Sequence, residues 1–180
     1  MAPRHEPSHV SGRYLLLWLA ALLLAACARQ PVLPDPLPDL TLPLQFHVQQ
    51  HDGAEVRDSI LVVQQEGDGW RWSWLDPLGV PQARQMLHDG QWRADGLLPP
   101  NPHARELFAA LLFALTPDAQ LAQLYAGRDW NSAPGHRTLR IDSSSAWQVY
   151  YAQDGQIHLD VGPSLTYGVA PLDTTGASAP

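Results

Sequence analysis

The chain has 180 residues, a formal net charge of −7 and no lysine, so all 11 of its basic residues are arginines. The acidic balance argues against nucleic acid as a partner, because phosphate binding needs clustered basic side chains. The lack of a lysine amine excludes Schiff-base chemistry, serine–lysine catalysis and a phosphate-binding P-loop. The single cysteine, Cys27, excludes an intramolecular disulfide.

The first 26 residues have the parts of a secretory signal. Arg4 and Arg13 form a positively charged start, residues 14–26 are almost entirely apolar, and small residues precede Cys27. The apolar run is shorter than the about 20 residues that a membrane-spanning helix needs. The letters LAAC, which end at Cys27, resemble a bacterial lipobox. The resemblance implies that residues 1–26 are removed and that Cys27 becomes an acylated N-terminus; an uncleaved short anchor is the alternative.

A lipidated Cys27 predicts where the protein resides. Its sulfur would be a lipid attachment point rather than a nucleophile or a metal ligand, and two or more acyl chains make a stable membrane anchor. Bacterial lipoproteins with alanine at the next position, here Ala28, are usually sorted to the outer membrane, so we expect the mature domain to face the periplasm. Loss of Arg4, Arg13 and Glu6 with the signal changes the formal net charge from −7 to −8.

Two unstructured segments are expected to border one folded domain. Prolines are dense between residues 29 and 43, and each lacks a backbone N–H and restricts the residue before it. We therefore expect residues 27–43 to form an extended tether behind the lipid. Residues 169–180 are mostly small and polar, which predicts a disordered tail. The folded domain is expected to span residues 44–168.

Five strands are expected before the first helix. Residues 44–51 alternate apolar and polar side chains, and residues 59–65 are apolar on both faces. Shorter strands follow at residues 70–75, 80–88 and 91–94, with glycine- or aspartate-containing turns between them. Turns at this spacing predict an antiparallel meander.

Two helices are expected next. Residues 101–115 begin with Asn101, which can cap a helix, and Pro102, which suits the first helical position. The segment is apolar nearly all round, so we expect this helix to be buried on several sides. We expect Thr116 to cap a second helix, which Gly127 ends.

Three further strands are expected at residues 136–141, 146–152 and 156–161, because each alternates apolar and polar side chains. The order of strands, helices and strands predicts a mainly antiparallel β fold with α (α+β). We expect one curved sheet, a half-barrel, whose concave side receives the central helical pair. A curved sheet closed by helices can leave an apolar cavity, which is a common form of site for a lipophilic ligand.

Apolar side chains on the inward faces of these elements are the candidates for such a cavity. Trp70, Trp72 and Trp74 occupy alternate positions of one strand, so their indoles share a face. They either pack as core against the helices or form a cavity wall, because indoles bury large areas in both settings. The full candidate set is Phe46, Trp70, Trp72, Trp74, Leu111, Trp147, Val149 and Tyr151.

A tight turn follows the tryptophan strand. Asp76, Pro77 and Gly79 stand at the first, second and fourth positions that a type I turn favours. Leu78 is therefore left at the third position, which is normally exposed. A leucine there is either an incidental surface residue or an apolar tip with a function.

The stretch WRWSWLDPLG, a following strand, a helical pair and the late pattern of Trp147, Val149 and Tyr151 together resemble the LolB family. Members of that family are outer-membrane receptors that take lipoproteins from a periplasmic carrier and insert them into the membrane. The resemblance covers roughly residues 44–161 and the lipobox, and it is closer to LolB-like lipoproteins often encoded beside aryl-polyene synthesis genes. It implies a LolB-like half-barrel and a membrane-insertion turn formed by Asp76, Pro77, Leu78 and Gly79.

We therefore expect a non-enzymatic outer-membrane lipoprotein that binds and passes on a hydrophobic moiety, such as an acyl chain, a lipidated partner or a polyene lipid. The resemblance implies a LolA-like periplasmic carrier as a partner, and we expect a monomer without cofactor or metal. One alternative is a lipid- or polyene-ester-processing enzyme, which needs Ser59 or Ser73 within reach of a histidine. The other is a structural envelope partner protein. His47 and His51 lie about 13 Å apart along a strand, so we expect surface histidines rather than metal ligands.

Overall fold

The computed structural model describes residues 31–98 and 101–172. The predicted signal segment, Cys27 and the last eight residues lie outside the described residues. The part that the structure describes forms one antiparallel sheet of ten strands with two helices, which confirms the α+β class. Among these residues no helix is long and apolar enough to cross a membrane.

The sheet has two halves that meet at β1. The first half is built from consecutive hairpins of β1 (Leu44–Asp52), β2 (Glu55–Glu66), β3 (Gly69–Leu75), β4 (Pro81–His88) and β5 (Gln91–Ala94). The second half is built the same way from β6 (Trp130–Ala133), β7 (His136–Arg140), β8 (Ala146–Tyr151), β9 (Ile157–Asp160) and β10 (Leu165–Pro171). β10 pairs with β1, so β5 and β6 are the two free edges of the described sheet, which is open.

The predicted strand pattern is confirmed in the first half of the sheet. Phe46 stands opposite Leu61, and Leu61 stands opposite Trp74, so apolar side chains of β1, β2 and β3 form a row on the inner face. All three are buried. The alternation seen in the sequence follows from this arrangement, because successive side chains of a strand point to opposite faces of the sheet.

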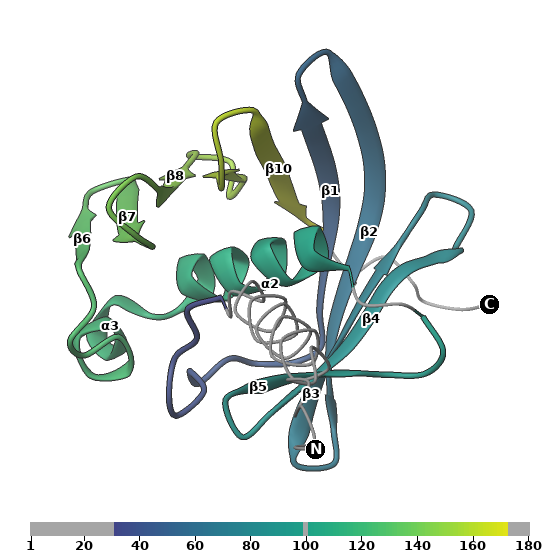
Figure 1. Ribbon diagram of the computed structural model, residues 1–180, viewed down its shortest axis with the longest axis horizontal. Helices are drawn as coiled ribbons and strands as arrows, with labels where there is room; N and C mark the ends of the chain where they lie inside the picture. Colours follow the sequence, from purple (N-terminus) through teal and green to yellow (C-terminus); the bar gives the residue numbers. More distant parts are fainter. Residues whose placement is uncertain (1–30, 99–100, 173–180) are drawn as a thin grey trace, which may run out of the picture. The chain divides into compact units, whose positions relative to one another are not determined.

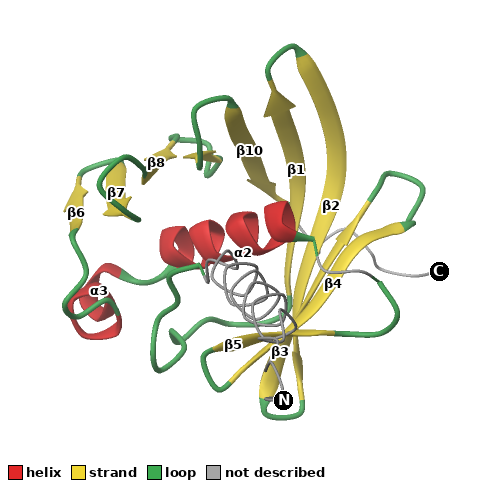
Figure 2. Ribbon diagram, in the orientation of Figure 1, coloured by secondary structure: helices red, strands yellow, loops and turns green. Residues whose placement is uncertain are grey.

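Helix α2 (Pro102–Leu115) lies in the concavity of the sheet, between β1–β5 and β6–β10 (Figure 2). Asn101 caps it as predicted, since its Oδ1 accepts a hydrogen bond from the Ala104 N–H at 3.1 Å. Both halves of the sheet contact the helix. The Phe108 ring lies 5.3 Å from that of Trp72 on β3, and Glu106 accepts a hydrogen bond from Trp147 on β8. Helix α2, predicted to be apolar nearly all round, therefore lies at the centre of the core.

The short helix α3 (Asp118–Leu124) follows, and here one expectation is wrong. Thr116 does not cap α3; it closes α2, because its Oγ1 donates to the Leu112 carbonyl oxygen at 2.8 Å. Strands β6 and β10 were also not predicted. Since β10 runs to Pro171, the expected tail starts too early: residues 169–171 belong to the sheet.

The proline-rich segment is a further correction. Residues 31–43 form neither helix nor strand, as predicted, but they are not a free tether. Val32 is buried, the Asp39 N–H donates to Gln120 of α3 at 3.0 Å, and four leucines pack against the core, namely Leu33, Leu37, Leu40 and Leu42. The leucines that alternate with the prolines bury apolar area, which fixes the segment to the domain.

Candidate functional site

The turn between β3 and β4 is held by its own backbone and by one carboxylate. The Gly79 N–H donates to the Asp76 carbonyl oxygen at 2.9 Å, which closes the predicted four-residue turn. The Asp76 side chain accepts hydrogen bonds from the N–H groups of Leu78 and Val80, each at 2.9 Å. The Asp76 carboxylate thus occupies the middle of the turn and fixes the backbone on both sides of Leu78.

This geometry places Leu78 outside the sheet. Gly79 has φ +82°, a left-handed value that favours glycine, and the pairing of β3 with β4 shifts register just before the turn. The Leu78 side chain is 89% exposed. The predicted exposure of Leu78 at the third turn position is confirmed.

A cavity of about 500 Å³ opens beside this turn. Its lining includes Trp74 of β3, Pro77 of the turn, and Asn101 and His103 at the N-terminal end of α2. The complete lining is Gln50, Arg57, Asp58, Ser59, Trp74, Asp76, Pro77, Gln82, Asn101 and His103. We call this space the mouth cavity.

The floor of the mouth cavity is buried and its rim is polar. Ser59 and Trp74 are both buried, and the Trp74 indole donates to the Ser59 hydroxyl oxygen at 2.6 Å. The rim side chains have local partners. Asp58 is hydrogen-bonded to His47 at 2.8 Å, and Arg57 pairs with Glu55 at 2.7 Å. A ligand in the mouth cavity would therefore meet an indole at the floor and polar groups around it.

Most of the eight candidate cavity residues lie in the packed core. Seven of them are at most 7% exposed, and Trp72, Trp147 and Leu111 have almost no exposed surface. Trp72 packs against Phe108 of α2, and Trp147 donates to Glu106. Of the eight, Trp74 lines the mouth cavity and Tyr151 lines a second cavity, described next. The structure thus brings the set together around α2, and it places six of its members outside the linings of these two cavities.

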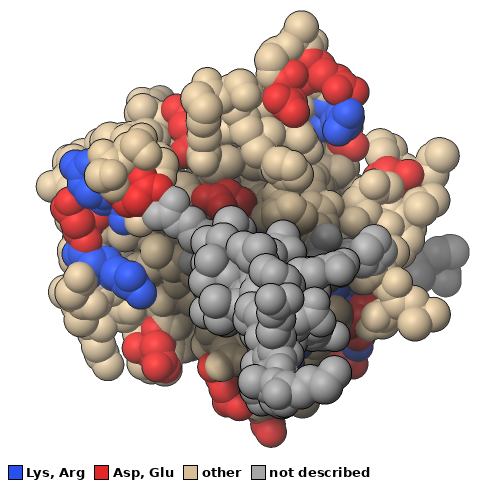
Figure 3. All heavy atoms as spheres, in the orientation of Figure 1, with Lys and Arg blue, Asp and Glu red and all other residues tan. Residues whose placement is uncertain are grey.

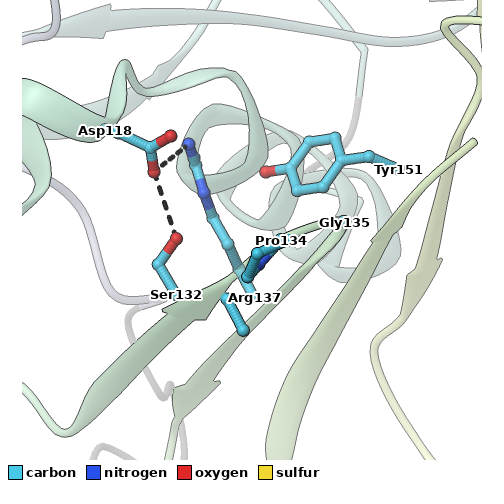
Figure 4. A pocket seen from close by; sticks show the side chains of 7 residues that line it. Asp118, Ser132, Pro134, Gly135, Arg137 and Tyr151 are labelled. Atoms are coloured by element: carbon cyan, nitrogen blue, oxygen red, sulfur yellow. Dashed lines mark hydrogen bonds and ion pairs between the residues drawn. The ribbon is translucent and has the colours of Figure 1, made fainter. Parts of the chain in front are cut away.

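The second cavity, of about 620 Å³, lies at the opposite end of α2 and is polar (Figure 4). Its lining includes Asp118, Ser132, Arg137 and Tyr151. Arg137 is only 7% exposed, and its Nη1 donates to three carbonyl oxygens at the end of α2, those of Phe113, Ala114 and Thr116, at 3.2, 3.1 and 2.7 Å. We call Arg137 with these partners the arginine clamp.

Two further contacts complete the arginine clamp. Nη2 of Arg137 donates to Asp118 at 2.9 Å, and the guanidinium lies 5.3 Å from the centre of the Tyr151 ring. The Tyr151 hydroxyl donates to the Ala114 carbonyl oxygen at 2.7 Å. Burial raises the pKa of Tyr151 to about 12, although the charge of Arg137 opposes the shift. Nothing in the residue pattern 136–141 predicted this use of Arg137, because α2 and β7 meet only in the fold.

Two other tyrosines are buried beside the core. Burial raises the pKa of Tyr125 and of Tyr167 well above its usual range. The Tyr167 ring lies 6.4 Å from that of Trp74, which forms part of the floor of the mouth cavity. These phenols stay neutral at physiological pH, so they add no charge to the core.

The serines and histidines named by the alternative hypotheses have other partners. The Ser59 hydroxyl donates to the Val48 carbonyl oxygen at 3.1 Å and accepts from Trp74. His47 pairs with Asp58, and His51 interacts with Gln49. Within the described residues no group of histidines, cysteines and carboxylates is placed to hold a metal ion. Ser59 and His103 nevertheless line the same cavity, and the Ser73 side chain points to the other face of β3 from the buried tryptophans.

On the visible face of the described residues, acidic groups are scattered and the larger groups of arginines lie beside acidic side chains (Figure 3). Arg140 pairs with Asp129 at 2.7 Å, and Arg71 pairs with Asp95 and with Glu66. Mixed pairs of this kind give no broad positive field for a polyanion.

Comparison of the chain with known protein families and with curated proteins finds no match.

Proposed function

We propose that this protein is a non-enzymatic outer-membrane lipoprotein that binds a hydrophobic moiety in the periplasm and passes it to the membrane. The observation that carries the proposal is the position of Leu78: it is 89% exposed at the tip of a hydrogen-bonded turn whose Pro77 lines a cavity. An apolar tip that is held away from the sheet by a hydrogen-bonded turn contributes little to the core, so its side chain is available for contacts outside the domain.

The dimensions of the site fit this role. Burying one leucine in hydrocarbon is worth about 1.5–3 kcal/mol, enough for repeated contact with a bilayer but not for permanent anchoring. Permanent anchoring would come from acylated Cys27. The mouth cavity, at about 500 Å³, falls within the size range of small-molecule sites and has an indole floor suited to an acyl chain or polyene. The turn would bring this cavity to the membrane surface, where cargo leaves it.

The fold of the described residues is compatible with a LolB-like receptor, and we include that relationship in the proposal. An open antiparallel sheet curves around α2 (Figure 2), with its two edge strands β5 and β6 unpaired to each other. A LolA-like carrier and a lipidated partner as cargo follow from the same proposal.

The enzymatic alternative depends on Ser59, which shares the mouth cavity with His103. Its hydroxyl already donates to a backbone carbonyl and accepts from an indole, whereas a nucleophile has to give its proton to a base. Ester hydrolysis that is lost in both Ser59→Ala and His103→Ala would favour the enzyme over our proposal.

Transfer of a bound fluorescent fatty acid from the full-length lipoprotein to acceptor liposomes tests the proposal. We expect Leu78→Glu to bind the fatty acid and to melt like the wild type, yet to lose transfer, because glutamate resists entry into hydrocarbon. Leu78→Phe keeps an apolar tip and is expected to retain transfer. Normal transfer by Leu78→Glu would contradict the proposal, as would a wild-type protein that takes up no fatty acid.

A further inference from the structure

A second loop presents an exposed leucine. Leu97, between β5 and α2, is 104% exposed, and Leu78 is 89% exposed. These are the two most exposed large apolar side chains of the described residues. Val80 beside the turn is 52% exposed. Leu97 therefore adds nothing to the core, just as Leu78 does not.

The base of the Leu97 loop is built like that of the Leu78 turn. An aspartate stands at the start of each: Asp76 accepts from backbone N–H groups, and Asp95 accepts from Arg71 Nε at 2.7 Å while its own N–H donates to the Arg84 carbonyl oxygen at 3.3 Å. Each also contains one glycine with positive φ, +86° at Gly96 in the Leu97 loop. Both leucines thus project from anchored backbone.

The two loops reach the same side of the molecule. Figure 1 shows the turn between β3 and β4 and the loop between β5 and α2 both extending to its right-hand edge. Strand β5 runs antiparallel to β4 and the Asp95 N–H bonds to the Arg84 carbonyl oxygen, so the end of β5 lies toward the start of β4. Leu78 and Leu97 therefore leave the sheet at the same end of these strands, and Pro77 beside Leu78 lines the mouth cavity.

A lipid bilayer fits this arrangement better than a protein does. The apolar groups are single side chains on separate loops rather than one continuous patch, and a protein partner normally buries a continuous, closely packed surface. A fluid bilayer can admit each leucine separately. The carboxylates at the loop bases are held within the domain, Asp95 by Arg71 and Asp76 by the backbone N–H groups of its own turn, so each leucine extends beyond them.

We propose that Leu97 is a second bilayer-contact residue, and that Leu78 and Leu97 together hold the mouth cavity against a phospholipid surface. The inference rests on the proposed function, since it adds a second contact to the membrane-facing turn. With two contacts the opening has a defined orientation at the membrane, which a single leucine cannot give.

A depth-sensitive label tests the inference. In the full chain with Cys27→Ser, one cysteine is introduced at position 78, 97, 56 or 150 and carries an environment-sensitive fluorophore. Tyr150 on β8, 44% exposed, is the distant control, and Val56 on β2, 51% exposed, is a control near the mouth cavity, beside its lining residue Arg57. Vesicles of phosphatidylethanolamine and phosphatidylglycerol contain a nitroxide-labelled lipid as quencher. We expect quenching at positions 78 and 97 and much weaker quenching at 56 and 150.

The possible outcomes separate the inference from the proposed function. Quenching at 78 but not at 97 overturns the second contact and leaves the single-tip proposal standing. No quenching at either position overturns both, and equal quenching at all four overturns the defined orientation. In a second experiment Leu97→Glu should lower vesicle affinity of the chain labelled at position 78 about tenfold or more, with an unchanged melting temperature. Unchanged affinity would contradict the inference.

Discussion

The two ends of α2 are built in opposite ways. At its C-terminal end the arginine clamp joins three carbonyl oxygens, Asp118 and the ring of Tyr151 through one buried guanidinium. At its N-terminal end the helix is capped by Asn101, and Asn101 and His103 line the mouth cavity. One end of α2 is thus clamped, and the other, which we call the open end, borders a cavity. In the proposed function, cargo would enter and leave at the open end while the arginine clamp holds the opposite end in place.

Removal of the arginine clamp should have the largest effect on stability. Arg137→Ala removes four hydrogen bonds of a buried guanidinium, to three carbonyl oxygens and to Asp118, which we expect to cost about 2–4 kcal/mol. The melting temperature should fall by on the order of 10 °C. Arg140→Ala is the matched control, since its pair with Asp129 is exposed and worth at most about 1 kcal/mol. An equally small loss of stability in both variants would show that the arginine clamp does not stabilise the C-terminal end of α2 more than an exposed ion pair would.

Loss of the turn carboxylate should have a smaller effect, at the other end of the molecule. Asp76→Ala removes two hydrogen bonds from the backbone around Leu78, and we expect a loss of about 1 kcal/mol in urea unfolding. Asp76→Asn keeps an acceptor oxygen and should recover most of it. If cargo transfer falls in Asp76→Ala and returns in Asp76→Asn, the ordered turn matters to function. Normal cargo transfer by Asp76→Ala would show that transfer does not depend on the hydrogen bonds of the Asp76 side chain.

Alkaline pH should lower the stability of the domain, in part through Tyr151 at the clamped end. The pKa of Tyr151 is about 12 in the fold and about 10 in the unfolded chain, so the neutral phenol is favoured by folding. Its contribution is complete below pH 10 and is lost as the pH rises from about 10 to 12. We expect Tyr151→Phe to reduce, but not abolish, the loss of stability over this range, because Tyr125 and Tyr167 also have raised pKa values. A pH profile identical to the wild type would contradict this assignment.

Local sequence patterns predicted one end of α2 much better than the other. Asn101, the helix and the exposed Leu78 follow from rules that act over four or five residues, such as capping, helical period and turn chemistry. The arginine clamp joins residues about 20 positions apart, and no local rule connects them.

Long-range pairing explains the other differences. The short edge strand β6 is stabilised by pairing with β7, and β10 by pairing with β1 and β9, so neither has a strong signal of its own. The prolines of residues 31–43 correctly predict a segment without helix or strand. They do not show that the leucines between them pack on the core. Leu97 was likewise overlooked, because exposure in a loop has no periodic pattern.

The smallest expected effect on stability is that of changing Leu78. It tests the difference between an exposed leucine of the turn and a buried leucine of α2. Leu78→Ala removes a side chain that is 89% exposed, so we expect the free energy of unfolding to change by less than about 0.5 kcal/mol. Leu111→Ala on α2, fully buried, should cost about 2–5 kcal/mol. Urea unfolding of both variants compares them directly. A substantial loss in Leu78→Ala would mean that Leu78 packs against the domain in solution. If Leu78→Ala leaves the stability unchanged and slows cargo transfer to liposomes, then Leu78 acts through contacts outside the domain. The open end of α2 would then be the functional end.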